Sequence, residues 1–304
     1  MNHIQLESML KNFFIEDIGS GDISGDAIFT DDERGSYSFL AKEDGVFCGS
    51  EVIRAGFHLM DPTAEIIVYR KDGERVEKGE MIAELKGTMR GLLKAERVIL
   101  NLIQRMSGIA TLTAKAVEIV RGTGANICDT RKTTPGLRMF EKYAVRIGGG
   151  YNHRMGLYDA IMLKDNHIAF AGGILSAMKK AKRFAGHTIK VEVEVETKEQ
   201  LEEAVKAGAD IIMFDNCQPE QIREWISYVP DHICTEASGG ITLSNLRAYA
   251  ETGVQWISLG FLTHSYQVLD ISAKVRPSFK NGLGGMENEI VTNPSANNGH
   301  SETI

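Results

Sequence analysis

The second half of the chain repeats one unit, a short apolar run followed by a segment with the length and spacing of a helix. The six runs are ANICDT, DAIMLKDNH, IKVEVEVE, DIIMFDN, HICTEASGG and WISLG. Strands that alternate with helices pair in parallel, because each helix returns the chain to the same end of the sheet. Six strands are too few for a complete (β/α)8 barrel. We therefore expect an open, incomplete parallel α/β barrel of about six strands.

The first hundred or so residues follow another pattern and are expected to form a mixed unit of helices and strands. Residues 4–14 carry apolar side chains at helical spacing. YSFLA, EIIVYR and EKGEMIAELKG are strand-like, and an Asp-Gly turn before the last of them predicts a hairpin. Residues 90–120 have a helical pattern that contains Ser107 and Gly108. We predict a helix break there and place the domain boundary beside it.

Composition and charge exclude several classes of protein. The 304 residues carry a formal net charge of -7, so no long basic surface is available to neutralise a nucleic-acid backbone. No apolar stretch is long enough to span a bilayer, and the first residues do not resemble a signal peptide. The four cysteines are widely spaced and form no Cys-x-x-Cys pair, which argues against a zinc site and a disulfide framework. We expect a cytoplasmic protein without nucleic-acid or membrane partners.

One short region opposes this overall acidity. DTRKTTPGLRMFEKYAVRIGGGYNHR, residues 129–154, contains six arginines and lysines but only two acidic residues. The cations are Arg131, Lys132, Arg138, Lys142, Arg146 and Arg154. Because the cluster is local, we predict that it serves a small anionic ligand. His153 and Arg154 could cap a helix, but beside Arg131 we favour a carboxylate-binding role for them.

Each of the six apolar runs ends in polar or glycine residues. In chain order they are Asp129 with Arg131 and Lys132; Lys164 with Asp165, Asn166 and His167; Glu192 with Glu194; Asp215 with Asn216; Glu236 with Ser238 and two glycines; and Gly260. In a parallel α/β barrel the residues that follow the strands meet at one rim, where active sites are built. Six such endings in succession therefore predict a site at this rim.

The run KVEVEVE gives the most specific prediction of these six endings. Side chains alternate along a strand, so the three valines share one face, and Glu192, Glu194 and Glu196 share the other. If the following helix covers the valines, the glutamates face the barrel interior, where an unpaired carboxylate is costly. They would then pair with lysines, with a metal-bound ligand or with a developing cation. The alternative is a solvated acidic face on an edge strand.

Lys164, Arg97 and the glycines of the last strands each allow more than one interpretation. Lys164 could be a buried lysine paired with a carboxylate, a Schiff-base nucleophile or a cation for an anionic substrate, and the other cations favour the last. The SGG sequence at 238–240 and Gly260 follow the last two strands. Barrels often bind phosphate there through backbone N–H groups, although turns need glycine too. Arg97 could form an ordinary surface salt bridge.

Several motifs in this chain resemble those of the quinolinate phosphoribosyltransferase family. They are, in order, DTRKTTPGLR, GGGYNHRMGLYDAIMLKDNH, VEVEVET, MFDN and EASGGIT, and the resemblance covers residues 5–278. It implies a type II phosphoribosyltransferase with an N-terminal α/β sandwich domain over residues 1–108, completed by residues 267–279. Residues 109–266 then form the open α/β barrel with the catalytic site. Residues 280–304, rich in Gly, Asn and Ser, are expected to be a disordered tail.

Members of this family convert quinolinate and phosphoribosyl pyrophosphate to nicotinate mononucleotide, pyrophosphate and CO2 in NAD biosynthesis. The resemblance implies that quinolinate is held by Arg131, His153, Arg154 and Lys164, with Arg97 coming from the partner subunit of a homodimer. The residues implied for phosphoribosyl pyrophosphate are Lys132, Glu194, Asp215, Ser238, Gly239 and Gly260. The cofactor implied is Mg²⁺, near Glu194 and Asp215. The candidate catalytic residues are Lys132, Lys164, Glu194 and Asp215.

Three alternatives remain open from the sequence. The first is a relative of the same fold that uses another acceptor such as nicotinate, although the residues implied for quinolinate favour a dicarboxylate. The second is a Schiff-base aldolase that uses Lys164. The third is a carrier of biotin or lipoate, resting on the segment KDGERVEKGE. That segment lacks a lysine in the usual setting at an exposed hairpin tip, so we expect it to be structural. Whether dimers assemble further also remains open.

Overall fold

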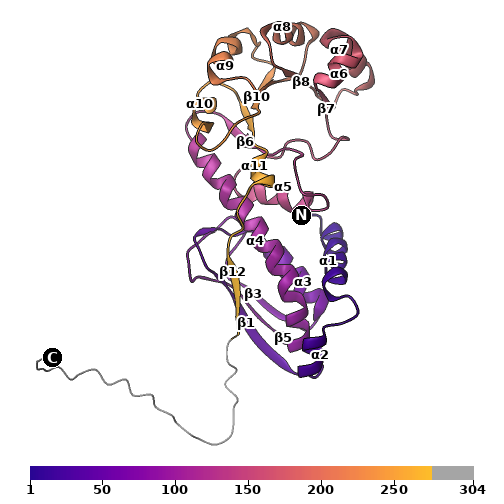
Figure 1. The fold of residues 1–304 in the computed structure, drawn as a ribbon, viewed down its shortest axis with the longest axis vertical. Coiled ribbons are helices and arrows are strands. Elements are labelled where there is room, and N and C mark those ends of the chain that lie inside the picture. The colour runs from indigo at the N-terminus through magenta and orange to yellow at the C-terminus, as the bar shows by residue number, and fades with distance from the viewer. Residues whose placement is uncertain (276–304) are drawn as a thin grey trace, which may run out of the picture.

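The computed structural model describes residues 1–275, in an N-terminal part and a barrel part that one long helix connects (Figure 1). That helix is α4 (Met89–Val120). The disordered tail predicted for residues 280–304 lies outside the described residues. Within residues 1–275, no helix combines the length and the apolar character that a membrane span requires.

The N-terminal part is a four-stranded antiparallel sheet covered by helices (Figure 1). Its strands are β1 (Arg34–Ala41), β3 (Glu65–Val68), β5 (Met81–Thr88) and β12 (Ile271–Val275), in the order β12-β1-β5-β3. Its helices are α1 (His3–Ile18), α2 (Ile23–Ile28) and α3 (Ser50–Met60). Phe39 of β1 and Phe57 of α3 are buried against each other between these layers. β12 follows the barrel in sequence, so a segment from beyond the barrel completes the N-terminal sheet.

The two predicted hairpin arms do pair antiparallel, as β3 and β5, but the Asp-Gly turn does not join them directly. β3 pairs with β5, whereas β4 (Arg75–Val76), which follows the turn, pairs with β2 (Gly45–Val46). Asp72 accepts a hydrogen bond from the backbone N–H of Ser50 at the start of α3 (2.8 Å) and another from the Tyr143 hydroxyl (2.7 Å). The alternating pattern located the strands, but strand partners depend on contacts between residues distant in sequence.

The six predicted strands of the second half form one parallel sheet in the order β6-β11-β10-β9-β8-β7. They are β6 (Asn126–Cys128), β7 (Ile161–Leu163), β8 (Val191–Val195), β9 (Ile211–Asp215), β10 (Cys234–Ser238) and β11 (Trp256–Ser258). The helices between and after them are α5 (Arg138–Ile147), α6 (Asp165–Ala171), α7 (Ile174–Phe184), α8 (Lys198–Ala207), α9 (Pro219–Trp225) with the 3-10 turn η1 (Ile226–Tyr228), α10 (Leu246–Ala250) and α11 (Phe261–His264). Within residues 1–275, the edge strands β6 and β7 do not pair with each other. The prediction of an open α/β barrel is confirmed.

The break predicted at Ser107-Gly108 is wrong, because α4 is continuous through both residues. The buried Ser107 hydroxyl accepts a hydrogen bond from the backbone N–H of Cys48 in the N-terminal part (2.9 Å). A Cβ on Gly108 would collide with the backbone carbonyl oxygen of Gln267, in the segment that returns from the barrel. Both residues are small because other parts of the chain pack closely on the helix there.

We expect Gly108→Ala to lower the free energy of unfolding by about 1–3 kcal/mol, because the added carbon presses on backbone atoms of Gln267. Gly186→Ala is the matched control, since a Cβ there meets nothing within 4 Å, and it should change stability by less than about 0.5 kcal/mol. Urea unfolding followed by circular dichroism measures both. Equal effects of the two substitutions would contradict the role of Gly108 in close packing.

Candidate active site

The carboxyl ends of the barrel strands line a pocket of about 490 Å³. The predicted site residues that line it are Arg131, Lys132, His153, Arg154, Lys164, Glu194, Asp215, Ser238 and Gly239. Gly260 lines an adjoining pocket of about 510 Å³, which shares Lys132 and the Ser238-Gly239 turn with the first. Arg97 lines neither pocket and is exposed on α4. The structure therefore brings together every site residue predicted in the barrel and leaves Arg97 apart.

A buried ion pair holds the loops that carry these residues. Lys142 Nζ of α5 lies 2.5 Å from Asp129 Oδ1, and the two side chains are 1% and 0% exposed. Asp129 also accepts hydrogen bonds from the Asn152 side chain (2.6 Å) and from the backbone N–H of His153 (2.9 Å). Burial raises the pKa of Asp129, while Lys142 and the hydrogen bonds act against that rise. The pair fixes the end of β6 relative to the segment that contains Arg154.

The basic stretch 129–154 divides into structural and pocket-lining cations. Lys142 is structural, and so is Arg138, which donates a hydrogen bond to the carbonyl oxygen of Met155 (3.0 Å). The guanidinium of Arg146 lies over the ring of Tyr151, 5.0 Å from its centroid. The prediction that the whole stretch serves a ligand is therefore wrong for these three residues. The charge pattern alone did not separate the two kinds, because burial is set by the fold.

The other three cations of this stretch line the pocket without an acidic partner. In the part of the chain that the structure describes, no carboxylate forms an ion pair with Arg131, Lys132 or Arg154. Among the described residues, the buried Nε of Arg131 has no hydrogen-bond partner. Burial and the neighbouring Arg131 cation lower the pKa of Arg154. A ligand with carboxylate groups would relieve this repulsion between the two guanidinium groups.

The carboxylates of the pocket come from two neighbouring strands. Glu194 of β8 forms an ion pair with Lys164, which follows β7, and Asp215 ends β9. Burial raises the pKa of both acids, and Lys164 acts in the opposite direction on each. β8 lies between β7 and β9, and Glu192 is buried, so the alternative of a solvated edge strand is wrong. The prediction that these glutamates face the barrel interior is confirmed for Glu192 and Glu194. Glu196 lies beyond the end of β8 and is exposed.

The adjoining pocket is lined by glycine backbone and basic side chains. Gly239 and Gly240 adopt left-handed φ values of 88° and 65°, and a side chain on Gly239 would collide with Asn216. Lys132 and His264 contribute the basic groups, and no acidic side chain from residues 1–275 lines this pocket. Backbone N–H groups together with cations are typical of a phosphate subsite. His264 was missed from the sequence because it lies in no recognisable motif.

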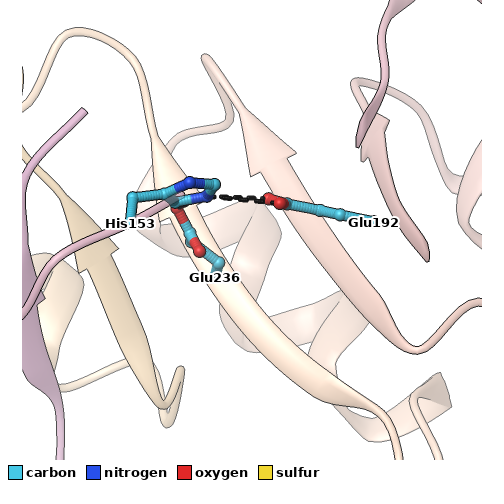
Figure 2. A group of neighbouring side chains, drawn as sticks. All are labelled: His153, Glu192 and Glu236. Atoms are coloured by element: carbon cyan, nitrogen blue, oxygen red, sulfur yellow. Dashed lines mark hydrogen bonds and ion pairs between the residues drawn. The ribbon is translucent and has the colours of Figure 1, made fainter. Parts of the chain in front are cut away.

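His153, Glu192 and Glu236 form a buried cluster beside the pocket that the sequence did not predict (Figure 2). His153 Nε2 lies 3.2 Å from a Glu192 oxygen and 3.6 Å from a Glu236 oxygen. Glu236 also accepts a hydrogen bond from the Ser258 hydroxyl. His153 Nδ1 accepts the backbone N–H of Arg154 (2.8 Å), which places the proton of a neutral ring on Nε2. A metal at Nε2 would require Nδ1 to donate. The cluster therefore suits a proton rather than a metal ion.

Fold and site together define a barrel enzyme that binds a small polyanion beside a phosphate-type subsite. Sequence profiles identify the family: the quinolinate phosphoribosyl transferase N-terminal domain matches residues 22–107, and the C-terminal domain matches residues 109–274. The chain belongs to the quinolinate phosphoribosyltransferase family, as the motifs predicted.

Named relatives agree with this assignment. The probable nicotinate-nucleotide pyrophosphorylase (carboxylating) of Bacillus subtilis strain 168 is 57% identical over 275 residues, which cover 90% of this chain and 95% of the relative. The crystal structure of NadC from Streptococcus pyogenes matches with a TM-score of 0.87 and 43% identity, over 90% of this chain and 97% of that chain. The nicotinate-nucleotide pyrophosphorylase structure from Francisella tularensis gives 0.86 and 38%, over 91% and 98%. The predicted fold is thus confirmed independently.

We expect Lys142→Met to lower the free energy of unfolding by about 3–5 kcal/mol at neutral pH, because it leaves the Asp129 carboxylate buried without its cation. Arg121→Ala breaks an exposed ion pair with Glu118 and is the control, with an expected loss below about 1 kcal/mol. Chemical unfolding at pH 7 measures both. A loss for Lys142→Met no greater than that of the control would refute the structural role of the buried pair.

Proposed function

We propose that this protein is a quinolinate phosphoribosyltransferase. It converts quinolinate and phosphoribosyl pyrophosphate to nicotinate mononucleotide, pyrophosphate and CO2, a step of NAD biosynthesis. The observation that carries the proposal is the group of unpaired cations, Arg131, Lys132 and Arg154, in the rim pocket of a chain that belongs to this family. Quinolinate brings two adjacent carboxylates and the co-substrate brings phosphate groups, so the two can be assembled only among several cations.

Quinolinate binds between the guanidinium groups of Arg131 and Arg154, with Lys164 as a further cation. A guanidinium group matches a carboxylate with two parallel hydrogen bonds, and within residues 1–275 neither Arg131 nor Arg154 forms an ion pair with an acidic side chain. His153 lines the same subsite, but its ring nitrogens are occupied by Glu192 and by backbone. We therefore assign it a place in the wall of the quinolinate subsite, held by these contacts, rather than the role of a direct hydrogen-bond donor to the substrate.

Phosphoribosyl pyrophosphate occupies the side of the pocket that adjoins Gly260. The backbone of Ser238-Gly239 and Gly260 receives its 5′-phosphate, and Lys132 neutralises part of the pyrophosphate. Glu194 and Asp215 face the ribose hydroxyls, and their oxygens are suitable ligands for Mg²⁺. When bound with this substrate, Mg²⁺ supplies charge neutralisation for the leaving pyrophosphate.

The reaction follows from these positions. As the C1–O bond to pyrophosphate breaks, the ribose gains oxocarbenium character, which Glu194 and Asp215 stabilise electrostatically. The pyridine nitrogen held by the arginines attacks C1 and becomes positively charged. The adjacent carboxylate then leaves as CO2, because the cationic ring can hold the electron pair until a proton replaces it. Lys132 and Lys164 act as charges throughout.

A turnover assay tests this function. Purified protein with quinolinate, phosphoribosyl pyrophosphate and Mg²⁺ should release nicotinate mononucleotide, and nicotinate as the acceptor should give none. Product from nicotinate instead would keep the fold and overturn the dicarboxylate assignment. The aldolase alternative has less support, because a Schiff-base lysine must be neutral, whereas Lys164 is held against the Glu194 carboxylate. The carrier alternative has less support too, since Val76 of its proposed segment is buried.

A homodimer with shared active sites and a cytoplasmic location complete the proposal. Arg97 is exposed on α4 close to the exposed apolar side chain of Leu93, and further apolar side chains are exposed on the barrel. Those on the barrel include Leu157, Tyr158 and Phe170. Exposed apolar groups of this size support an interface between two copies. The cysteines are free thiols, which suits a reducing compartment.

Arg131→Ala should lower kcat/KM for quinolinate by about 100-fold or more, because it removes a bidentate carboxylate partner. The KM for phosphoribosyl pyrophosphate should change much less. Arg183→Ala, on the outer helix α7, controls for the loss of a positive charge and should leave both parameters unchanged. Quinolinate kinetics that survive the Arg131 substitution would remove this residue from the site.

Arg97→Ala should impair turnover although the residue lies outside the pocket of its own chain. In a heterodimer of the Arg97→Ala and Arg131→Ala chains, one site would contain both arginines and the other neither. Randomly mixed dimers should therefore recover roughly a quarter of wild-type activity. Absence of recovery in verified heterodimers would count against shared sites.

A further inference from the structure

Two elements of the barrel rim carry the groups proposed for the phosphates of phosphoribosyl pyrophosphate, and they are distant in sequence. Lys132 lies in the loop after β6, whereas Gly260 is the residue at which α11 begins. In the structure the two elements are in contact, because a Cβ on Gly260 would lie only 3.1 Å from Lys132 Cδ. The aliphatic stem of Lys132 therefore packs directly against Gly260.

The Thr263 side chain connects these two elements by hydrogen bonding. Thr263 lies in α11 and is fully buried. Its hydroxyl oxygen is 2.8 Å from the carbonyl oxygen of Lys132 and 3.2 Å from that of Gly260. A hydroxyl has one proton to donate, so the shorter contact, to Lys132, is the stronger one. Within residues 1–275, the Lys132 carbonyl oxygen accepts no other hydrogen bond.

The other backbone group of Lys132 is held within its own loop. Its N–H donates to the hydroxyl oxygen of Thr130 (3.0 Å). The Lys132 ammonium has no acidic partner within residues 1–275, so the backbone is the part of this residue that hydrogen bonds hold in place. Thr263 lines neither rim pocket. Its hydroxyl can therefore influence a ligand only through Lys132 and the Gly260 turn.

We propose that Thr263 is a positioning residue, whose hydroxyl fixes Lys132 relative to the Gly260 turn so that both ends of phosphoribosyl pyrophosphate are bound together. The proposal rests on the proposed function, in which Gly260 receives the 5′-phosphate and Lys132 the pyrophosphate. One ribose carries both groups, at C5 and at C1, so the substrate fixes the distance between them. Protein groups that are free to move relative to each other lose that freedom on binding, which weakens affinity. The Thr263 hydrogen bond removes this freedom before the substrate arrives.

Thr263→Val tests the proposal, because valine has the shape of threonine but lacks the hydroxyl. We expect the KM for phosphoribosyl pyrophosphate to rise about 3- to 10-fold, as for the loss of one hydrogen bond, and the KM for quinolinate to stay within about twofold. A smaller fraction of folded protein would lower kcat and leave both KM values unchanged. Initial rates with each substrate varied at a saturating concentration of the other measure this difference.

Two further variants separate the hydroxyl from its surroundings. Thr263→Ser keeps the hydroxyl and lacks the methyl group, so the KM for phosphoribosyl pyrophosphate should stay within about twofold of the wild-type value. Thr113→Val is the matched control, since Thr113 is equally buried but donates to the Ile109 carbonyl oxygen within α4 (2.8 Å) and lines neither rim pocket. It should leave both KM values unchanged. If Thr263→Val does not fold, Thr263→Ala takes its place, because it differs from the serine variant only by the hydroxyl.

The outcomes separate this proposal from the function on which it rests. An unchanged KM for phosphoribosyl pyrophosphate in Thr263→Val, an equal rise in both KM values, or a serine variant as impaired as the valine variant would overturn the positioning role. Each of these results would leave the proposed function intact. Absence of turnover by the wild-type protein would overturn the proposed function, and the role of Thr263 with it.

Discussion

The ion pair between Lys142 and Asp129 is the contact on which the site depends. Two fully buried charges would be costly apart, and together they connect α5, the end of β6 and the segment before β7. Hydrogen bonds from Asn152 and from the backbone of His153 complete the network. The loops are thus held without the help of Arg154, whose guanidinium donates to the carbonyl oxygen of Ala160 and to the sulfur of Met162 and lines the pocket.

The charged side chains of the site form two groups, those that pair with each other within the barrel and those that line the pocket. Two lysines of the barrel are paired with acids, Lys142 with Asp129 and Lys164 with Glu194, whereas Lys132 is not paired with an acid within residues 1–275. The pocket arginines Arg131 and Arg154 have no acidic partner within residues 1–275. A site preorganised in this way gains most from a ligand that carries several negative charges. The pocket thus selects its ligand through charges that the fold has left unpaired.

The sequence predicted the barrel well because its strands are local patterns and their order follows from the βα repeat. It also predicted which residues meet at the rim, since parallel strands end on the same side. The sequence failed where contacts between distant residues decide the structure. Gly108 was predicted to break a helix, but it is small because the backbone of Gln267 packs against it. For the same reason it could not separate Lys142 from Arg131, because the two differ in burial and not in charge.

The position of Arg97 extends this argument beyond one chain. The pocket opens at the barrel rim, and a cationic ribose would react with water there unless a surface covers it. Within residues 1–275, neither rim pocket has a lining residue from the N-terminal sheet or from its helices α1 to α3. The exposed arginine and the apolar side chains on both parts of the chain offer such a cover from a second copy. If the proposed dimer forms, the open barrel of one copy and the N-terminal part of the other would be the two halves of one site.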